Sequence, residues 1–121
     1  MAPKLTARQL SQLAFLQTLP PKFQKAQGVI EQMAAMQADD SVVRGFGRLM
    51  DEIKANAQAL GLGGLADTAG LMGTMSRRGG GLQMKVRGLR ELLGSLRINY
   101  DGALKQAGTP DKREEEGGAP A

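Results

Sequence analysis

The sequence of 121 residues contains no cysteine and no histidine. Without cysteine neither a disulfide framework nor a thiolate metal site can form, and this absence is compatible with a reducing cytoplasm. The lack of histidine removes the commonest metal ligand and the commonest general base near neutral pH. These absences favour a protein that is not an enzyme and that uses no cofactor or metal.

Aromatic residues are also scarce, with no Trp, one Tyr and three Phe, although 41% of the chain is apolar. The core must therefore be built from Leu, Met, Ala, Val and Ile. Such a set suits interdigitating helices better than a sheet, in which β-branched and aromatic residues usually dominate. The composition predicts an all-α protein.

Long hydrophobic runs are missing as well. The first ten residues, MAPKLTARQL, lack the apolar run of a secretion signal, and no stretch approaches the roughly 20 apolar residues of a membrane span. We therefore expect a cytoplasmic protein with no membrane partner. The length suits one compact core and is short for two domains.

Charge is distributed unevenly along the chain. The net charge is +4, but residues 111–116 hold four acidic and two basic side chains, so residues 1–108 carry +6. A basic body of this kind suits nucleic acid, an anionic lipid surface or an acidic protein patch. The sign of the charge does not choose among them.

Apolar residues recur at steps of three and four between evident helix starts and stops. Thr6 and Gln9 form a capping box, the pair Pro20 and Pro21 suits a first helical turn, and Gly61 suits a helix end. The expected helices run to about residue 17, from about 20 to 38, from about 42 to 60, from about 65 to 75, and from 82 to about 107.

Short connections between these helices predict an antiparallel four-helix bundle with a short N-terminal helix. We expect residues 1–108 to form this single helical-bundle domain. Residues 109–121 are polar and contain glycine and proline, so we expect a disordered tail there.

One stretch resembles a known family. Residues 51–61, DEIKANAQALG, followed by LGGLADTAGLM, resemble the signature of histidine-phosphotransfer domains, small four-helix bundles that relay phosphate in bacterial two-component signalling. The apolar position, the lysine Lys54, the small residues and the Leu-Gly helix end match in register. Asp51 stands where the family has its phosphoaccepting histidine, and the likeness spans most of residues 10–107.

The resemblance implies a degenerate, non-catalytic member that has kept the docking face and lost the phosphorelay chemistry. Its partner would be the receiver domain of a response regulator, which carries an acidic pocket, or a related signalling protein. We expect Lys54 to pair with Asp51, and small side chains to let the partner approach the third helix. The expected docking face consists of Arg44, Gly47, Arg48, Asp51, Lys54, Ala55 and Gln58.

Asp51 itself is a poor phosphoacceptor by this account. Receiver-type aspartates depend on Mg²⁺ held by neighbouring carboxylates. Glu52 is adjacent but points about 100° away around a helix, and no other carboxylate falls on the same face within one turn.

Two alternatives remain open. The first is a basic helical nucleic-acid-binding protein. Its phosphate-binding residues would be a second basic cluster that consists of Arg77, Arg78, Lys85, Arg87 and Arg90. The shortage of aromatic residues for base stacking weakens this alternative. The second is a helical oligomerisation module whose leucine-rich last helix pairs with itself.

Overall fold

The structure is a computed structural model that describes residues 4–110. This part of the chain is all-α and has no strand, as the composition predicts. Its helices are α1 (Ala7–Leu16), α2 (Leu19–Ala34), α3 (Asp40–Ala59), α4 (Gly63–Arg77) and α5 (Leu82–Ala107).

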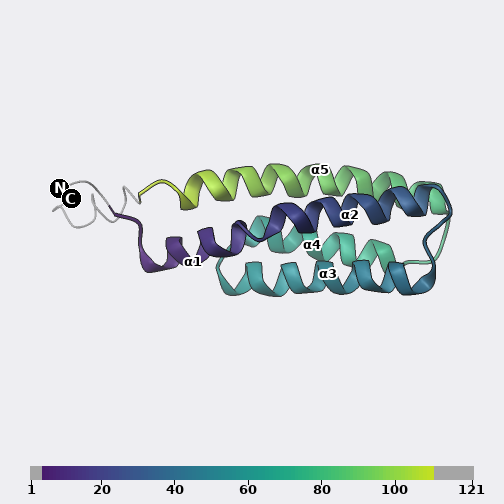
Figure 1. Ribbon diagram of the computed structural model, residues 1–121, viewed down its shortest axis with the longest axis horizontal. Helices are drawn as coiled ribbons and strands as arrows, with labels where there is room; N and C mark the ends of the chain where they lie inside the picture. Colours follow the sequence, from purple (N-terminus) through teal and green to yellow (C-terminus); the bar gives the residue numbers. More distant parts are fainter. Residues whose placement is uncertain (1–3, 111–121) are drawn as a thin grey trace.

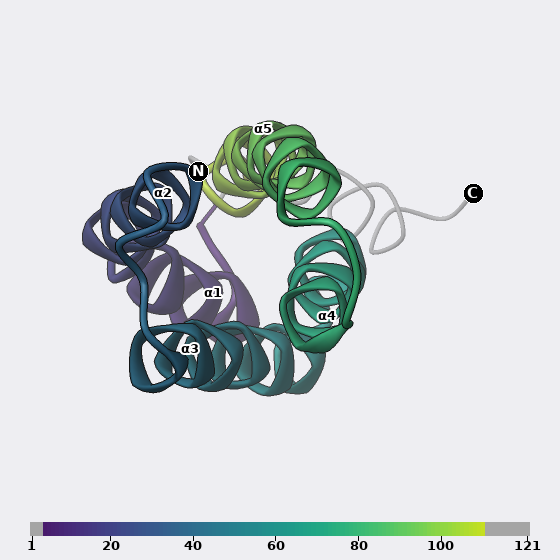
Figure 2. The same ribbon diagram turned by 90° about the vertical axis from the view of Figure 1, so that its right-hand side faces the viewer.

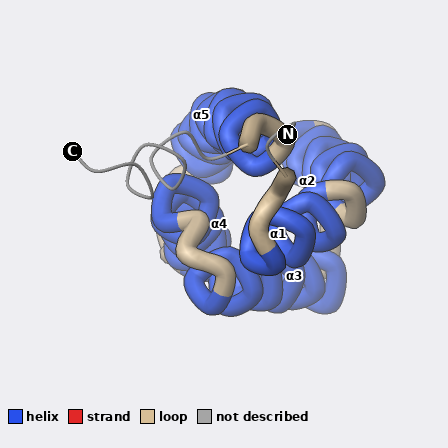
Figure 3. The backbone as a smooth tube through the Cα atoms, turned by 90° about the vertical axis from the view of Figure 1, so that its left-hand side faces the viewer, coloured by secondary structure: helices blue, strands red, loops and turns tan. Residues whose placement is uncertain are grey.

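The four longer helices form an up-and-down bundle. Helices α2, α3, α4 and α5 run alternately in opposite directions (Figure 1) and occupy the four corners of the bundle when it is viewed end-on (Figure 2). The α2–α3 and α4–α5 connections lie at one end. The α3–α4 connection lies toward the other end, where α1 also sits (Figure 3). The predicted bundle with a short N-terminal helix is therefore confirmed.

Helix α1 is capped at its N-terminus and is hydrogen-bonded to segments that follow two other helices. Its N-terminus carries the predicted capping box, in which the Thr6 hydroxyl accepts from the backbone N–H of Gln9 and the Gln9 side chain accepts from the N–H of Thr6. The Gln9 amide also donates to the carbonyl of Thr109 (2.7 Å), and the Gln12 amide donates to that of Leu60 (2.8 Å). These bonds attach α1 to the C-terminal ends of α5 and α3.

One hydrophobic core fills the space between the helices. It is aliphatic except for Phe23 and Phe46, and Phe23 meets the ring of Tyr100 edge-on with ring centroids 5.4 Å apart. The leucine stripe of α5 belongs to this core, since Leu89, Leu93 and Leu96 are buried. The same stripe is therefore not available for pairing with a second copy of α5.

Two of the helices end in the same hydrogen-bonded turn. After α3, Gly61 adopts φ 73° while the N–H groups of Gly61 and Leu62 donate to the carbonyls of Gln58 and Ala57. This Schellman motif confirms the predicted stop, because glycine adopts a positive φ without steric penalty.

The end of α2 was predicted near residue 38, and that prediction is wrong. Helix α2 ends at Ala34, and Met36 takes the left-handed position with φ 59°. The N–H groups of Met36 and Gln37 donate to the carbonyls of Met33 and Gln32, which completes the same motif. A non-glycine residue in this position gives no sequence signal of a helix end.

Among residues 4–110, none of the helices combines the length and the apolar character that crossing a membrane requires. Helix α5 ends at Ala107 with Gly108 as its C-cap. Residues 111–121 of the expected disordered tail lie outside the described residues, and the division into domain and tail stays a prediction.

Candidate functional site

Asp51 and Glu52 lie on α3 but turn to opposite neighbours. Asp51 is exposed and pairs with Arg77 of α4, whereas Glu52 pairs with Lys22 of α2 at 3.2 Å. Successive helical residues diverge by about 100°, which places one carboxylate at each edge of α3. The two carboxylates therefore do not form a joint site for a cation.

The Asp51 carboxylate is held in a two-point contact. Nη1 of Arg77 donates to Oδ1 at 3.3 Å, and Nη2 donates to Oδ2. Hydrogen bonding to Asp51, and then the attraction of its negative charge, raise the pKa of Arg77 above its usual value. The side chains of both residues remain about half exposed, so the pair lies at the surface where α3 meets α4.

The expected pairing of Asp51 with Lys54 is wrong. Lys54 is exposed, and its aliphatic stem lies against α4: a β-carbon placed on Gly70 would lie 3.2 Å from Cδ of Lys54. The planar fork of Arg77 reaches the carboxylate from across the helix interface and matches both of its oxygens, which an ammonium group cannot do.

We expected Gly47 to form part of the exposed docking face, and that expectation is wrong. Gly47 is buried beneath Arg77, and a β-carbon placed there would lie 3.0 Å from Nη2 of that guanidinium. Gly73 on α4 is equally close to the pair, since its β-carbon would lie 3.2 Å from Oδ1 of Asp51. Small residues here let α3 and α4 approach each other and let the ion pair lie across both helices.

The rest of the expected docking face is accessible. Arg44, Arg48, Ala55 and Gln58 are exposed on α3, as is Lys54. Within residues 4–110, none of the cations Arg44, Arg48 and Lys54 forms an ion pair. The face that α3 presents beside Asp51 is therefore positively charged.

The second basic cluster is divided by the fold. Besides Arg77, which binds Asp51, Arg90 makes a two-point contact with Glu31 of α2 at 3.1 and 3.0 Å. Arg87 lies 3.6 Å from Glu91 one turn along α5. Only Arg78 and Lys85 of this cluster have no ion-pair partner among the described residues.

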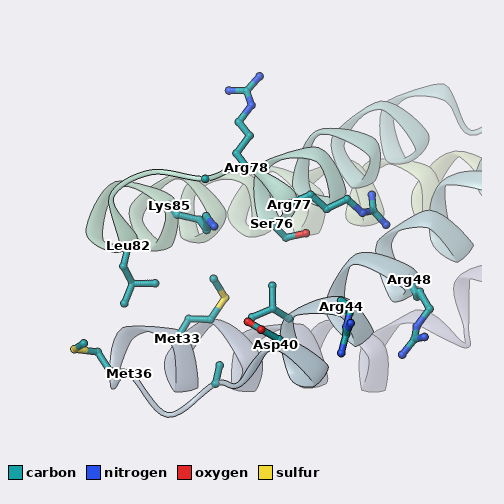
Figure 4. A pocket seen from close by; sticks show the side chains of 13 residues that line it. Met33, Met36, Asp40, Arg44, Arg48, Ser76, Arg77, Arg78, Leu82 and Lys85 are labelled. Carbon is teal, nitrogen blue, oxygen red and sulfur yellow. The ribbon is translucent and has the colours of Figure 1, made fainter.

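Arg78 and Lys85 instead join the α3 cations around one cleft. The cleft has a volume of about 820 Å³ and lies at the end of the bundle where the α2–α3 and α4–α5 connections run (Figure 4). Its lining consists of Met33, Met36, Ala38, Asp40, Val43, Arg44, Arg48, Ser76, Arg77, Arg78, Gly79, Leu82 and Lys85. The sequence assigns these cations to two alternative sites. Arg44 and Arg48 belong to the expected docking face, and Arg78 and Lys85 belong to the second basic cluster.

Within the part of the chain that the structure describes, acidic residues do not gather in a way that suits a metal. Among residues 4–110, no three side chains from His, Cys, Asp and Glu come close enough together to hold a metal ion. Comparison of the chain with protein-family models, with curated proteins and with solved structures gave no match. The resemblance to histidine-phosphotransfer domains therefore rests on the residues quoted above.

Proposed function

We propose that this protein is a non-catalytic adaptor that binds the receiver domain of a response regulator, or a related two-component signalling protein, through the exposed face of α3. The observation that carries the proposal is the set of exposed cations on that face. Arg44, Arg48 and Lys54 follow one another along α3 beside Asp51, and none of them forms an ion pair within residues 4–110.

Exposed cations without internal partners suit contact with a partner's carboxylates. Their charge is not neutralised within the bundle, and complementary charge raises the rate of encounter and disfavours neutral or basic partners. A receiver domain, with its acidic pocket, has the required chemistry. The bundle supplies a rigid backbone for these cations, because the opposite side of α3 is anchored in the core by Phe46, Met50 and Ile53.

The Asp51 position supports binding in place of phosphotransfer. The chain has no histidine, and the Asp51 carboxylate is already bound by Arg77. Its adjacent carboxylate, Glu52, is turned toward Lys22 of α2. An aspartate in this setting keeps a negative charge at the centre of the face but has no second carboxylate beside it to share a cation.

Charge reversal on α3 tests the proposal. The protein is titrated at low salt against a panel of purified receiver domains, and binding is measured by calorimetry. We expect the double variant Arg48→Glu/Lys54→Glu to lose binding by at least about tenfold while circular dichroism shows unchanged helicity.

A matched control keeps the change in net charge the same. Arg87→Glu/Lys105→Glu alters two exposed cations of α5 that lie away from the α3 face, and we expect it to bind nearly as well as the wild type. Equal affinity of the α3 double variant and the wild type would show that the face is wrongly placed, and a panel without any binder would remove the proposal.

A further inference from the structure

The cleft between the two helix connections has an apolar floor. Met33 of α2 is buried, and Val43 of α3 and Leu82 of α5 are half-buried and still reach the cleft. In Figure 4 the side chains of Met33 and Leu82 face each other across it. Partly exposed aliphatic side chains that line a concavity gain from covering by an apolar group.

The rim of the cleft is cationic on both sides. Arg44 and Arg48 stand on the α3 wall, and Arg78 and Lys85 stand on the wall formed by the end of α4 and the start of α5. Asp40, in the first turn of α3, is the carboxylate that the lining contains. With Arg77 bound to Asp51, the lining contains four further cations and this one acidic residue.

The directions of the rim side chains point to an extended occupant. In Figure 4 Arg78 extends away from the cleft on one side, whereas Arg44 and Arg48 extend away on the opposite side. A single compact anion on the floor would not meet both walls in this arrangement. An occupant that carries carboxylates on both flanks, with an apolar group between them, would meet both walls and the floor together.

We infer that this cleft binds a polypeptide segment of the partner in which one large aliphatic side chain stands between acidic residues. The aliphatic side chain covers the half-buried Val43 and Leu82 beside the buried Met33, and the flanking carboxylates meet Arg44 and Arg48 on one wall and Arg78 and Lys85 on the other. This inference rests on the proposed adaptor function and specifies which chemistry the partner presents.

Nucleic acid fits the cleft less well than such a segment. The described aromatic residues, Phe15, Phe23, Phe46 and Tyr100, do not line the cleft, so bases would find no aromatic surface on which to stack. A phosphodiester backbone also presents no aliphatic group that could cover the floor.

Peptide binding to the full chain tests the inference. The probe is a fluorescent eight-residue peptide with leucine between two acidic flanks, and its anisotropy is measured at low salt. Replacing the leucine by alanine should weaken binding about tenfold. The double variant Arg44→Glu/Arg78→Glu, which changes one cation on each wall, should weaken binding at least tenfold.

The matched control is Arg87→Glu together with Lys105→Glu, which gives the same change in net charge outside the cleft and should keep most of the affinity. Equal binding of the leucine and alanine peptides would overturn the inference. Equal losses in the cleft and control variants would overturn it too. Displacement of the peptide by inorganic phosphate, at the same concentration of negative charge as the peptide, would indicate a general anion site instead. Displacement by a short DNA duplex under the same condition would indicate a nucleic-acid site, and either result would overturn the inference.

Failure of this inference can be told from failure of the proposed function. If the peptide does not bind while receiver binding still depends on Arg48 and Lys54, the cleft assignment is wrong and the adaptor proposal stands. If the peptide binds as expected and no receiver binds, the cleft assignment stands and the receiver is the wrong partner.

Discussion

The guanidinium of Arg77 on α4 holds the carboxylate of Asp51 on α3 in a two-point contact that lies across Gly47 and Gly73. Residues 51–61 resemble the signature of histidine-phosphotransfer domains, and Asp51 stands where that signature has its reactive histidine. The contact also removes Arg77 from the cations that a partner could meet at the neighbouring cleft. One ion pair therefore shapes both the α3 face and the cationic rim.

The Asp51–Arg77 pair should have a modest and salt-sensitive effect on stability. Replacing Arg77 by Gln should lower the midpoint of thermal unfolding by a few degrees at most, and the effect should shrink in high salt because both side chains are half exposed. The raised pKa of Arg77 means that the pair's contribution is fully present below arginine's ordinary pKa. It is lost only as the pH rises through the raised value.

The difference in midpoint between the wild type and Arg77→Gln should accordingly stay constant between about pH 7 and pH 10. Calorimetric scans at three pH values and two salt concentrations measure it. A difference that disappears below pH 10 would contradict the assignment of this contact to a guanidinium whose pKa is raised.

Asp51 should not accept phosphate. When the protein is incubated with acetyl phosphate and Mg²⁺, incorporation of phosphate should be the same in the wild type and in Asp51→Asn, because the carboxylate is bound by Arg77 and lacks a neighbouring acidic partner. A receiver domain serves as the positive control. Hydroxylamine-sensitive labelling of the wild type that is lost in Asp51→Asn would contradict the adaptor account.

Two glycines of α3 should respond differently to alanine. A β-carbon at Gly45 meets nothing within 4 Å, so Gly45→Ala should raise the free energy of unfolding by about 0.5–1 kcal/mol through helix propensity. A β-carbon at Gly47 would lie 3.0 Å from Nη2 of Arg77, so the guanidinium must shift by a few tenths of an ångström. The gain in Gly47→Ala should therefore be smaller, and urea unfolding compares the two variants. Equal gains would indicate that Arg77 does not lie over Gly47.

The left-handed residue after α2 offers a further test of the fold. Met36 has φ 59° and is 82% exposed, so Met36→Gly should relieve steric strain and raise the free energy of unfolding by about 1 kcal/mol. Met84 is 80% exposed in the first turn of α5, and the same change there should lower stability by up to about 1 kcal/mol. Loss of stability in both variants would place the end of α2 elsewhere.

Most of the fold could be predicted from local patterns. The capping box of Thr6 and Gln9 and the stop at Gly61 each depend on residues only a few positions apart, and each lies where the sequence predicts it. The end of α2 could not be predicted, because Met36 adopts a conformation that side-chain chemistry does not favour.

The site was predictable only in part. Helical spacing correctly places Asp51 and Glu52 on different sides of α3, and it correctly leaves Arg44 and Arg48 exposed. Spacing within one helix says nothing about which neighbour lies across an interface. The partner of Asp51 is Arg77, which lies 26 positions further along the chain, so the spacing within α3 could not identify it. For the same reason no sequence pattern indicated the cleft between α3 and the α4–α5 connection.

Mapping the bound surface tests the central claim most directly. Backbone amide shifts of the isotope-labelled protein are recorded while a receiver domain from the panel is added at low salt. The account predicts that the largest changes fall in residues 40–58 and 76–85, which contain the exposed α3 face and the rim of the cleft. Changes centred on α1 or on residues 87–105 of α5 would contradict it.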